Sequence, residues 1–588
     1  MEKVINKKIF FFLVLSVLTT QATVASNKKS PSKKTTQKTN KEMTNKVAQA
    51  HFDLGKAYQE EKNIEEAIIN LQKALDRDPK HLSTLFLLGK IYLENKKEYN
   101  KAIEYFKKKL KLNPKCYKSE CSLANAYYNK KNTDLAIAHY KKSIAINQKY
   151  IPAYEGLANA LIRKKKMEYA TDIYLQALEQ APRSVETINK LIDLLIKQKR
   201  FDEAADYCKK SIKIKDDDNN QAKVSQLFSF CNHHEEALKI LQKLHKKHPE
   251  NDKIANSLAY SYKQTGDCEK NIDFLKTALE LNPKNKSAQI NLAHSLLSIG
   301  DFANGWTRFY NYKTKKSNTR LGNKKGIKGR AVLIQGEWNL KDNIMFLRYI
   351  KEVKKLGAKK IIVQTPQSLI PILERCPDID QIINMNKATP CSYNKKIPLT
   401  CLPKIFETTV ETIPNETPYI DVDQKIVNQW KERLQHDTAL KIGVYNAKNS
   451  SIPMAHIMRL SATENTSTYI LRGKIDHQDL HTIPNSKMVH LFGKGFEGTD
   501  TDIVNLSAII KNMNLVITND SFVAHLAGAL GAPVWVMLPY ITDWRWLRDR
   551  ANSPWYPTMK LFRQKKEDKD WDAVIDAMIK ELEKIATQ

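Results

Sequence analysis

A period of about 34 residues runs from Val47 to Tyr312 and constrains the fold of this 588-residue chain more than any other feature. Each period carries small residues and large apolar residues at fixed offsets, and most periods end near a proline. In the first period the small positions are Gly55, Ala67 and Ala74, and Pro79 follows. This pattern predicts two short helices per period, with the small residues at the points where the helices touch.

The offsets are those of the tetratricopeptide repeat (TPR), and several positions recur together in most periods. Because each unit buries its apolar face only against its neighbours, about eight units predict an α-solenoid over residues 47–312 with a concave face. A groove of that kind predicts a peptide or protein partner. The recurring positions in the later periods are Leu88, Gly89, Tyr92, Ala102 and Pro114, then Leu123, Tyr127 and Ala136, then Leu157, Ala170 and Pro182, then Ala204, Ala237 and Pro249, and finally Leu258, Ala278 and Leu292.

The net charge of +32 comes from 96 Lys and Arg residues against 64 Asp and Glu residues, and it is spread along the chain. A nucleic-acid-binding protein concentrates its cations on one element with aromatic residues between them, and no such motif is present, so we expect no nucleic-acid partner. Anionic partners such as a nucleotide sugar or a membrane surface suit the charge. The eight cysteines are scattered without disulfide or zinc spacing.

Residues 1–26 have the composition of a targeting segment, with Lys3 and Lys7 before an apolar run over 9–18 and a small-residue cleavage site at Ala25. A cleaved signal peptide predicts a periplasmic or secreted protein. Residues 27–46 are rich in Lys, Ser, Thr and Asn, which predicts a basic, disordered linker. Positive charge directly after an apolar segment resists translocation, so a short anchor on the cytoplasmic face of the membrane stays an open alternative.

After a basic linker over 313–328, short apolar runs alternate with helical patterns, which predicts an α/β region with parallel sheets. We expect two halves, 329–438 and 439–588. The predicted elements are strands over 331–335, 361–364, 379–383 and 440–444, a loop over 336–342, and helices over 343–356 and 366–375.

The stretch 514–557 predicts a strand over 515–518, a helix over 521–530 and a second strand over 534–538. Asn519 and Asp520 suit the start of the helix, and Gly531 suits its end. Ligands of open α/β sheets bind at the carboxyl ends of the strands, and a helix N-terminus there favours an anion such as a phosphate. Ser521 and His525 are one turn apart, so both can face that crevice; alternatively, His525 only bonds a loop carbonyl.

The sequence of this stretch closely resembles the C-terminal motif block of bacterial TPR proteins that end in a glycosyltransferase-family-9-like domain. The resemblance is carried by DSFVAHLAGALGAPVW, DWRWLRDRANSPWYP and LFRQ. Those domains are related to lipopolysaccharide heptosyltransferases and, more distantly, to protein O-GlcNAc transferases. The resemblance covers roughly Gly300 to the end of the chain. It implies a GT-B domain of two Rossmann-like halves whose C-terminal half binds a nucleotide sugar. The donor-binding residues that it implies are Asn519, Asp520, Ser521, His525, Gly528 and Arg545.

The relatives also carry an aspartate in the first βα loop, within the sequence Glu-x-Gly-x-Gly-Asp. Here Glu337 and Asp342 occupy the two acidic positions, while Asn339 and Lys341 replace both glycines. The resemblance implies Asp342 and Glu337 as catalytic residues, with a carboxylate deprotonating the acceptor hydroxyl. Asp342 has a second interpretation as the N-cap of the following helix.

Two further segments carry the resemblance. LLSIGDFANGWTRFYNYK is similar to the segment that docks the repeats onto the transferase domain, with Gly300, Trp306 and Tyr310 at the matching positions. The run Trp544-Arg545-Trp546 either clamps a base or sugar by stacking and charge, or fills the seam between domains with its two Trp rings.

These features favour a glycosyltransferase that moves a sugar from a nucleotide-sugar donor to a protein or glycan acceptor held by the TPR array. The lost glycines favour the alternative, a TPR interaction scaffold with an inactive transferase-like domain. We expect no metal, because no acidic cluster of the DxD kind lies in the predicted transferase crevice and cationic groups can replace a metal. No cofactor is expected either, since the nucleotide sugar is a substrate.

Overall fold

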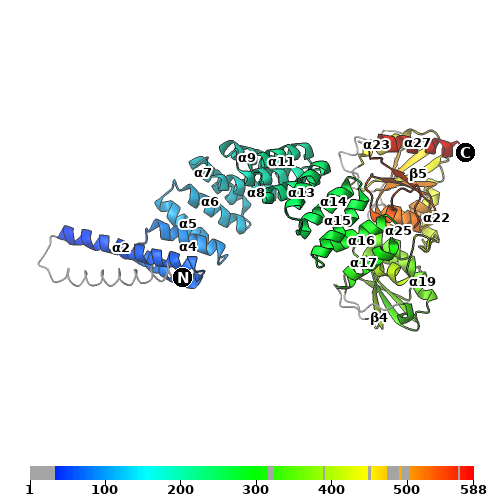
Figure 1. Ribbon diagram of the computed structural model, residues 1–588, viewed down its shortest axis with the longest axis horizontal. Helices are drawn as coiled ribbons and strands as arrows, with labels where there is room; N and C mark the ends of the chain where they lie inside the picture. Colours follow the sequence, from blue (N-terminus) through cyan, green and yellow to red (C-terminus); the bar gives the residue numbers. More distant parts are fainter. Residues whose placement is uncertain are drawn as a thin grey trace. The chain divides into compact units, whose positions relative to one another are not determined.

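The structure is a computed structural model that describes residues 33–315, 324–387, 391–447, 450, 452–472, 489–492, 502–566 and 570–587 (Figure 1). The chain divides into two compact units, one up to Ile240 and one from Leu241 onward. The division falls inside the repeat region, not at the linker expected over 313–328. The expected targeting segment, 1–26, lies outside the described residues. Among the described residues, no helix has the length and apolarity needed to cross a bilayer.

The first unit consists of antiparallel helix pairs at the predicted period. The alanines at the inter-helix contact positions, among them Ala67, Ala102 and Ala136, are fully buried, so the helices approach closely there. The helices are α2 (Lys33–Glu60), α3 (Ile64–Arg77), α4 (Leu82–Glu94), α5 (Tyr99–Leu112), α6 (Tyr117–Asn129), α7 (Thr133–Ile146), α8 (Ile151–Arg163), α9 (Met167–Gln180), α10 (Val185–Lys197), α11 (Phe201–Ile214), α12 (Asp218–Phe230) and the start of α13 (His234–Lys247).

The turn inside each helix pair contains one residue in the left-handed region, and this conformation recurs at the same period. The residues are mostly lysines, although glycine takes this conformation with the least strain. They are Lys62, Lys97, Lys131, Lys165, Lys199 and Asn232 in the first unit and Gly266 and Gly300 in the second.

Residues 33–46 differ from the expected disordered linker, because they form the first half of α2. The segment contains Lys, Gln and Glu residues that favour helix, and it lacks Pro and Gly, so the first repeat helix extends backward without interruption.

The second unit begins with four more repeat helices: α14 (Asp252–Gln264), α15 (Cys268–Leu281), α16 (Lys286–Ser298) and α17 (Phe302–Lys315). With α2 to α13 they bring the described helices of the repeat region to sixteen, which confirms the predicted TPR solenoid. A region with parallel sheets follows, as expected.

The first sheet has four parallel strands in the order β3-β2-β1-β4. The strand β4 was not expected, and the helix expected over 343–356 is divided at Arg348, whose Nε donates to the carbonyl of Met345. The strands are β1 (Ala331–Gln335), β2 (Lys360–Thr365), β3 (Gln381–Asn384) and β4 (Lys395–Pro398); the helices are α18 (Leu340–Phe346), α19 (Tyr349–Lys355), α20 (Ile370–Leu373) and α21 (Leu402–Ile405).

The second sheet has six parallel strands in the order β10-β9-β8-β5-β6-β7, in which the direction of winding reverses between β5 and β8. This is the order of a doubly wound sheet with a ligand crevice at the reversal. The strands are β5 (Leu440–Tyr445), β6 (Thr466–Ile470), β7 (Val489–Leu491), β8 (Leu515–Asn519), β9 (Val534–Leu538) and β10 (Met559–Arg563); the helices are α22 (Gln424–Leu434), α23 (Met454–Met458), α25 (Ile503–Lys511), α26 (Phe522–Ala529) and α27 (Asp572–Ala586).

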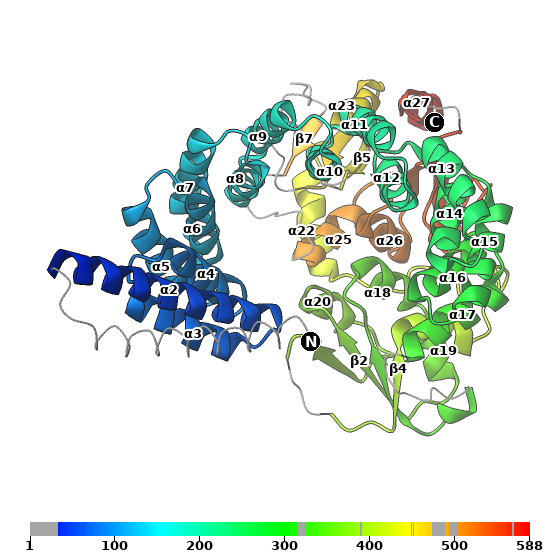
Figure 2. The same cartoon turned by 60° about the vertical axis from the view of Figure 1, so that its left-hand side comes forward.

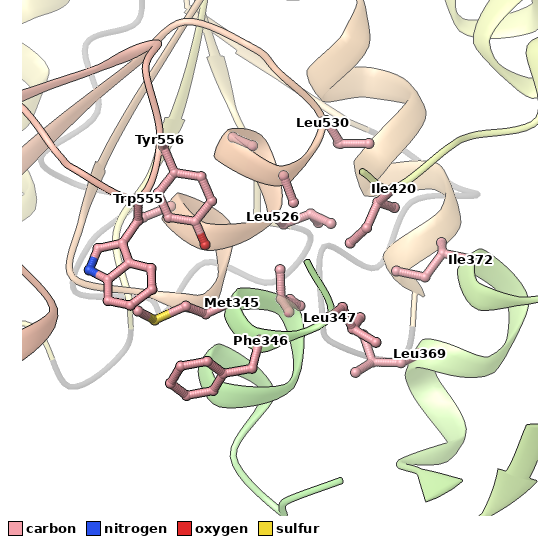
Figure 3. Packing of buried hydrophobic residues seen from close by; sticks show 14 of the residues in the cluster. Met345, Phe346, Leu347, Leu369, Ile372, Ile420, Leu526, Leu530, Trp555 and Tyr556 are labelled. Carbon is pink, nitrogen blue, oxygen red and sulfur yellow. The ribbon is translucent and has the colours of Figure 1, made fainter. Parts of the chain in front are cut away.

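The predicted docking segment joins the last repeat to the α/β region. Trp306 on α17 is 2% exposed and meets Phe346 and Trp544 edge to face, with ring centroids 5.9 and 5.3 Å apart. Apolar side chains also fill the seam between the two sheets, where α18 lies beside α26 (Figures 2 and 3). Met345 and Leu526 are two of these side chains (Figure 3).

Candidate functional site

A hydrogen bond spans the winding reversal of each sheet at the carboxyl ends of its strands. In the first sheet, between β1 and β4, the hydroxyl of Thr400 donates to Glu337 Oε1 over 2.7 Å. In the second sheet, between β5 and β8, the backbone N–H of Ala447 donates to Asn519 Oδ1 over 3.3 Å. Two of the predicted site residues therefore lie at the positions where parallel sheets bind ligands.

The loop after β1 is held by the buried amide of Asn343. Its Nδ2 donates to the carbonyls of Glu337 and Asn339, and its Oδ1 accepts the N–H of Glu337 over 3.1 Å. Asn339 is the N-cap of α18 and accepts the N–H of Lys341. The interpretation of Asp342 as the N-cap is therefore wrong, and its carboxylate is available for other contacts.

The helix after β8 begins at Ser521, not at the two residues before it. Ser521 is the N-cap of α26: its Oγ accepts the N–H of Ala524 over 3.4 Å and also bonds the hydroxyl of Thr518 over 2.8 Å. Asn519 ends the strand, and the side chain of Asp520 points to another partner. The physical reason is that the extended backbone of Ser521 lets a short hydroxyl reach the N–H three residues on.

Lys341, at the start of α18, bridges the two sheets. Its ammonium donates to Asp520 Oδ1 over 2.8 Å and to the Asp520 carbonyl over 2.9 Å. The side chains of the pair are 27% and 25% exposed, so the bridge lies at the edge of water. A cation thus lies beside the N-terminus of α26, where the sequence predicts an anion.

The next residue, Asp342, forms a second bridge. It accepts a hydrogen bond from Arg545, which follows β9, and Arg545 also bonds Asp543 Oδ1 over 2.6 Å. Burial disfavours the charge of Arg545, but Asp543 and Asp342 outweigh that effect and raise its pKa above the usual value. The candidate base therefore shares a buried arginine with a second carboxylate.

The side chain of His525 does not face the open crevice that was predicted at the start of α26. It is fully buried, its Nδ1 lies 3.0 Å from the hydroxyl of Tyr556, and its ring stacks on Trp546 with centroids 5.1 Å apart. Burial lowers its pKa well below the usual value, and Arg545, Lys341 and Arg348 act in the same direction. His525 is accordingly neutral, and its Nε2 has no hydrogen-bond partner among the described residues.

Gly528 lies on the same buried face of α26. A β-carbon there would come within 2.5 Å of the Tyr556 ring and 2.6 Å of Met559 Cε, so this glycine allows the helix to pack closely. The contact is with the protein interior, and the predicted donor contact of Gly528 stays a prediction.

The aromatic residues divide between the seam and the solvent. Trp544 is 4% exposed and Trp546 is fully buried, which agrees with the interpretation that these two rings fill the seam. Trp338, in the loop beside Glu337, is by contrast 73% exposed.

The last repeats contribute charged and titratable groups around Arg545. Burial lowers the pKa of His294 on α16 to about 4, an effect that Asp543 opposes and Lys263 on α14 reinforces. Burial also lowers the pKa of Lys263, with Asp543 opposing. Local spacing gave no signal for Asp543, His294 and Lys263, because they meet only in the folded chain.

In the first unit, a groove of about 570 Å³ lies among the helices α4 to α8. Polar and aromatic side chains line it, including Asn125, Asn159 and Tyr128, and the Tyr140 hydroxyl donates to Asn125 Oδ1. Side-chain amides of this kind can bond the backbone of an extended peptide.

Sequence comparison places the repeats in a known class. Residues 48–81 match one tetratricopeptide-repeat family, and residues 82–116, 119–150 and 253–285 match a second one. No curated protein matches the chain. The repeats are therefore tetratricopeptide repeats, and they make this region of the chain a protein-interaction scaffold.

Solved structures resemble parts of the chain. YrrB, described as a TPR protein with an unusual peptide-binding site, is 19% identical over 32% of this chain and 96% of its own, with a TM-score of 0.27. A TPR protein from Parabacteroides merdae is 15% identical over 40% and 94%, with a TM-score of 0.32. PilF from Pseudomonas aeruginosa is 17% identical over 42% and 96%, with a TM-score of 0.29.

Proposed function

We propose that the chain is a glycosyltransferase with the GT-B arrangement, which moves a sugar from a nucleotide-sugar donor to a protein or glycan acceptor held by the TPR array. The observation that carries the proposal is the meeting of Lys341 and Asp342 with Asp520 and Arg545. This meeting gathers two carboxylates, two cations and a helix N-terminus at the winding reversals of two parallel sheets.

These groups suit the chemistry of sugar transfer. The acceptor oxygen attacks the anomeric carbon, the bond from that carbon to the phosphate oxygen breaks, and the nucleoside diphosphate leaves with the electron pair. The proton of the acceptor hydroxyl passes to the carboxylate of Asp342. Lys341, Arg545 and the N–H groups at the start of α26 stabilise the charge on the departing diphosphate.

The ion pairs couple donor binding to the release of the base, Asp342, from Arg545. A diphosphate competes with Asp342 for Arg545 and with Asp520 for Lys341, because phosphate oxygens form strong charge-assisted bonds to both cations. Donor binding then releases Asp342 to accept the proton of the acceptor.

A second function, a scaffold with an inactive transferase-like domain, is favoured by one observation. The Lys341 ammonium already occupies the space beside the α26 N-terminus, and Asp520 there offers a carboxylate that repels phosphate. A crevice that this ion pair already fills suits a domain that does not bind a nucleotide sugar.

Calorimetric titration of the whole chain with UDP, GDP and ADP sugars tests the first function against the second. Saturable binding that Lys341→Gln weakens about tenfold supports the transferase. Lys580→Gln, an exposed lysine on α27, is the matched control and should bind like the wild type.

Asp342→Asn separates binding from chemistry. It should still bind the donor but release nucleoside diphosphate about 10²- to 10⁴-fold more slowly, because the base is lost. No binding of any of the three donors to the wild-type chain would overturn the transferase and leave the scaffold.

A further inference from the structure

A cavity of about 510 Å³ lies at the carboxyl ends of the neighbouring strands β9 and β10. It lies beside the turn between α14 and α15, where Arg548 donates to the Gly266 carbonyl and a β-carbon on Gly266 would come within 2.5 Å of the Tyr540 hydroxyl. None of the residues that line it belongs to the candidate donor site. The lining residues are Tyr540, Thr542, Arg548, Asp549, Arg563, Gln564, Lys565 and Lys566.

The charge of this cavity is strongly unbalanced. Among the described residues that line it, four side chains are cationic and one, Asp549, is a carboxylate. The hydrogen bonds of its two arginines go to neutral acceptors. Arg563 donates to the hydroxyl of Thr542 and to the carbonyls of Arg550, Trp546 and Leu547, and Arg548 donates to the Gly266 carbonyl and the Cys268 sulfur.

The surroundings of Arg563 work against its charge. Burial lowers its pKa to about 10; Asp549 opposes this effect, and Arg548 and Arg550 reinforce it. A half-buried guanidinium among like charges is stabilised by any anion that enters the cavity, since the anion replaces lost hydration and offsets the repulsion.

The loop that forms the wall is held in a specific shape. Leu547 and Asp549 both lie in the left-handed region, at φ of 51° and 53°, which residues other than glycine rarely adopt. The guanidinium of Arg563 fixes this loop through the Trp546, Leu547 and Arg550 carbonyls. Hydrogen bonds from Arg563 to the backbone of the loop therefore fix the shape of this cavity wall.

We propose that this cavity binds the phosphate or sulfate group of a small ligand, at a site beside the sugar-transfer crevice. Guanidinium and ammonium groups supply charge-assisted hydrogen bonds to the tetrahedral oxyanion, and Thr542, Tyr540 and Gln564 offer neutral donors. The volume exceeds that of one oxyanion and accommodates the body of a small phosphorylated or sulfated molecule.

Calorimetric titration of the full chain with pyrophosphate, inorganic phosphate and sulfate tests the site. Arg548→Gln and Lys566→Gln should each weaken binding of the best anion about tenfold, whereas Lys580→Gln should leave it unchanged. Lys566 is exposed, so its replacement keeps the test valid even where Arg548→Gln disturbs the contact with Gly266.

The Lys341→Gln variant distinguishes this site from the crevice. Anion binding that Lys341→Gln abolishes and Lys566→Gln leaves intact places the anion beside α26 and overturns the proposal. Anion binding that persists in Lys341→Gln supports it, whatever happens to nucleotide-sugar binding. Absence of binding for all three anions at millimolar concentration also overturns it.

Discussion

The ammonium of Lys341 lies 2.8 Å from the carboxylate of Asp520, and the two residues are separated by 179 positions in the sequence. Lys341 follows the first strand of one sheet, and Asp520 follows β8 of the other. One pair of side chains thus bridges the carboxyl ends of the two sheets.

This bridge should contribute modestly to stability, because both partners are about a quarter exposed. A double-mutant cycle of Lys341→Ala and Asp520→Ala should give a coupling free energy of about 0.5–1 kcal/mol in chemical denaturation at low salt. The coupling should fall at 1 M salt. A coupling of zero at low salt would mean that the pair does not form in solution.

Trp306 should anchor the last repeat to the α/β region. Trp306→Ala removes a buried ring from the aromatic cluster and should cost about 3–5 kcal/mol in the free energy of unfolding of the second unit. Trp338→Ala is the matched control: that ring is 73% exposed, so the change should stay within about 0.5 kcal/mol. Equal effects of the two changes would contradict the packing described above.

The lysines in the left-handed turns should be suboptimal for stability. Lys131 has a φ of 64°, so Lys131→Gly relieves backbone strain and should stabilise the repeats by about 1 kcal/mol. Its neighbour Lys130 has a φ of −73°, and Lys130→Gly should destabilise them, since glycine there only adds freedom to the unfolded chain. Thermal unfolding of the two variants should shift in opposite directions.

His294 should make stability depend on pH. Burial lowers its pKa from 6.5 to about 4 in the folded chain, so the unfolded chain takes up the proton first as the pH falls. The stabilising contribution is therefore complete above pH 6.5 and is lost progressively down to about pH 4.

His294→Gln removes this contribution. The stability difference between the wild type and the variant should change by about 1–3 kcal/mol between pH 7 and pH 4. Urea denaturation at a series of pH values measures it, and parallel curves for the two proteins would contradict the assigned environment of His294. Buried His525 titrates in the same direction in both proteins, so it cancels in the comparison.

Local sequence signals predicted the centre of the second sheet closely, whereas its strands β6, β7 and β10 were not predicted. β8, α26 and β9 end within about one residue of expectation, because apolar runs and Gly531, with a φ of 75°, define them. The strand β4 escaped prediction, since only Ile397 of its four residues is buried and two lysines precede it. Its identity comes from backbone pairing with β1.

The candidate site was less predictable. The positions of Glu337 and Asn519 at the strand ends followed from the alternation of strands and helices. The spacing of Ser521 and His525 predicted that both lie on one side of the helix. It did not predict which residues pack against that side, and in the structure Tyr556 and Trp546 cover His525. Ion pairs between residues that lie far apart in sequence have no local signature, so Lys341 and Arg545 had no assigned partners.

The division of the chain inside the repeat array has a practical consequence for dissecting the protein. A cut at the apparent linker after the last helix would strip Trp306 and Phe302 from the rings of Phe346, Trp544 and Trp555. The severed α/β fragment would then expose an aromatic patch to water and would tend to aggregate. A fragment that begins near Leu241 keeps the helices that bury this aromatic patch. The helices α14 to α17 therefore belong to the α/β region as much as to the repeats.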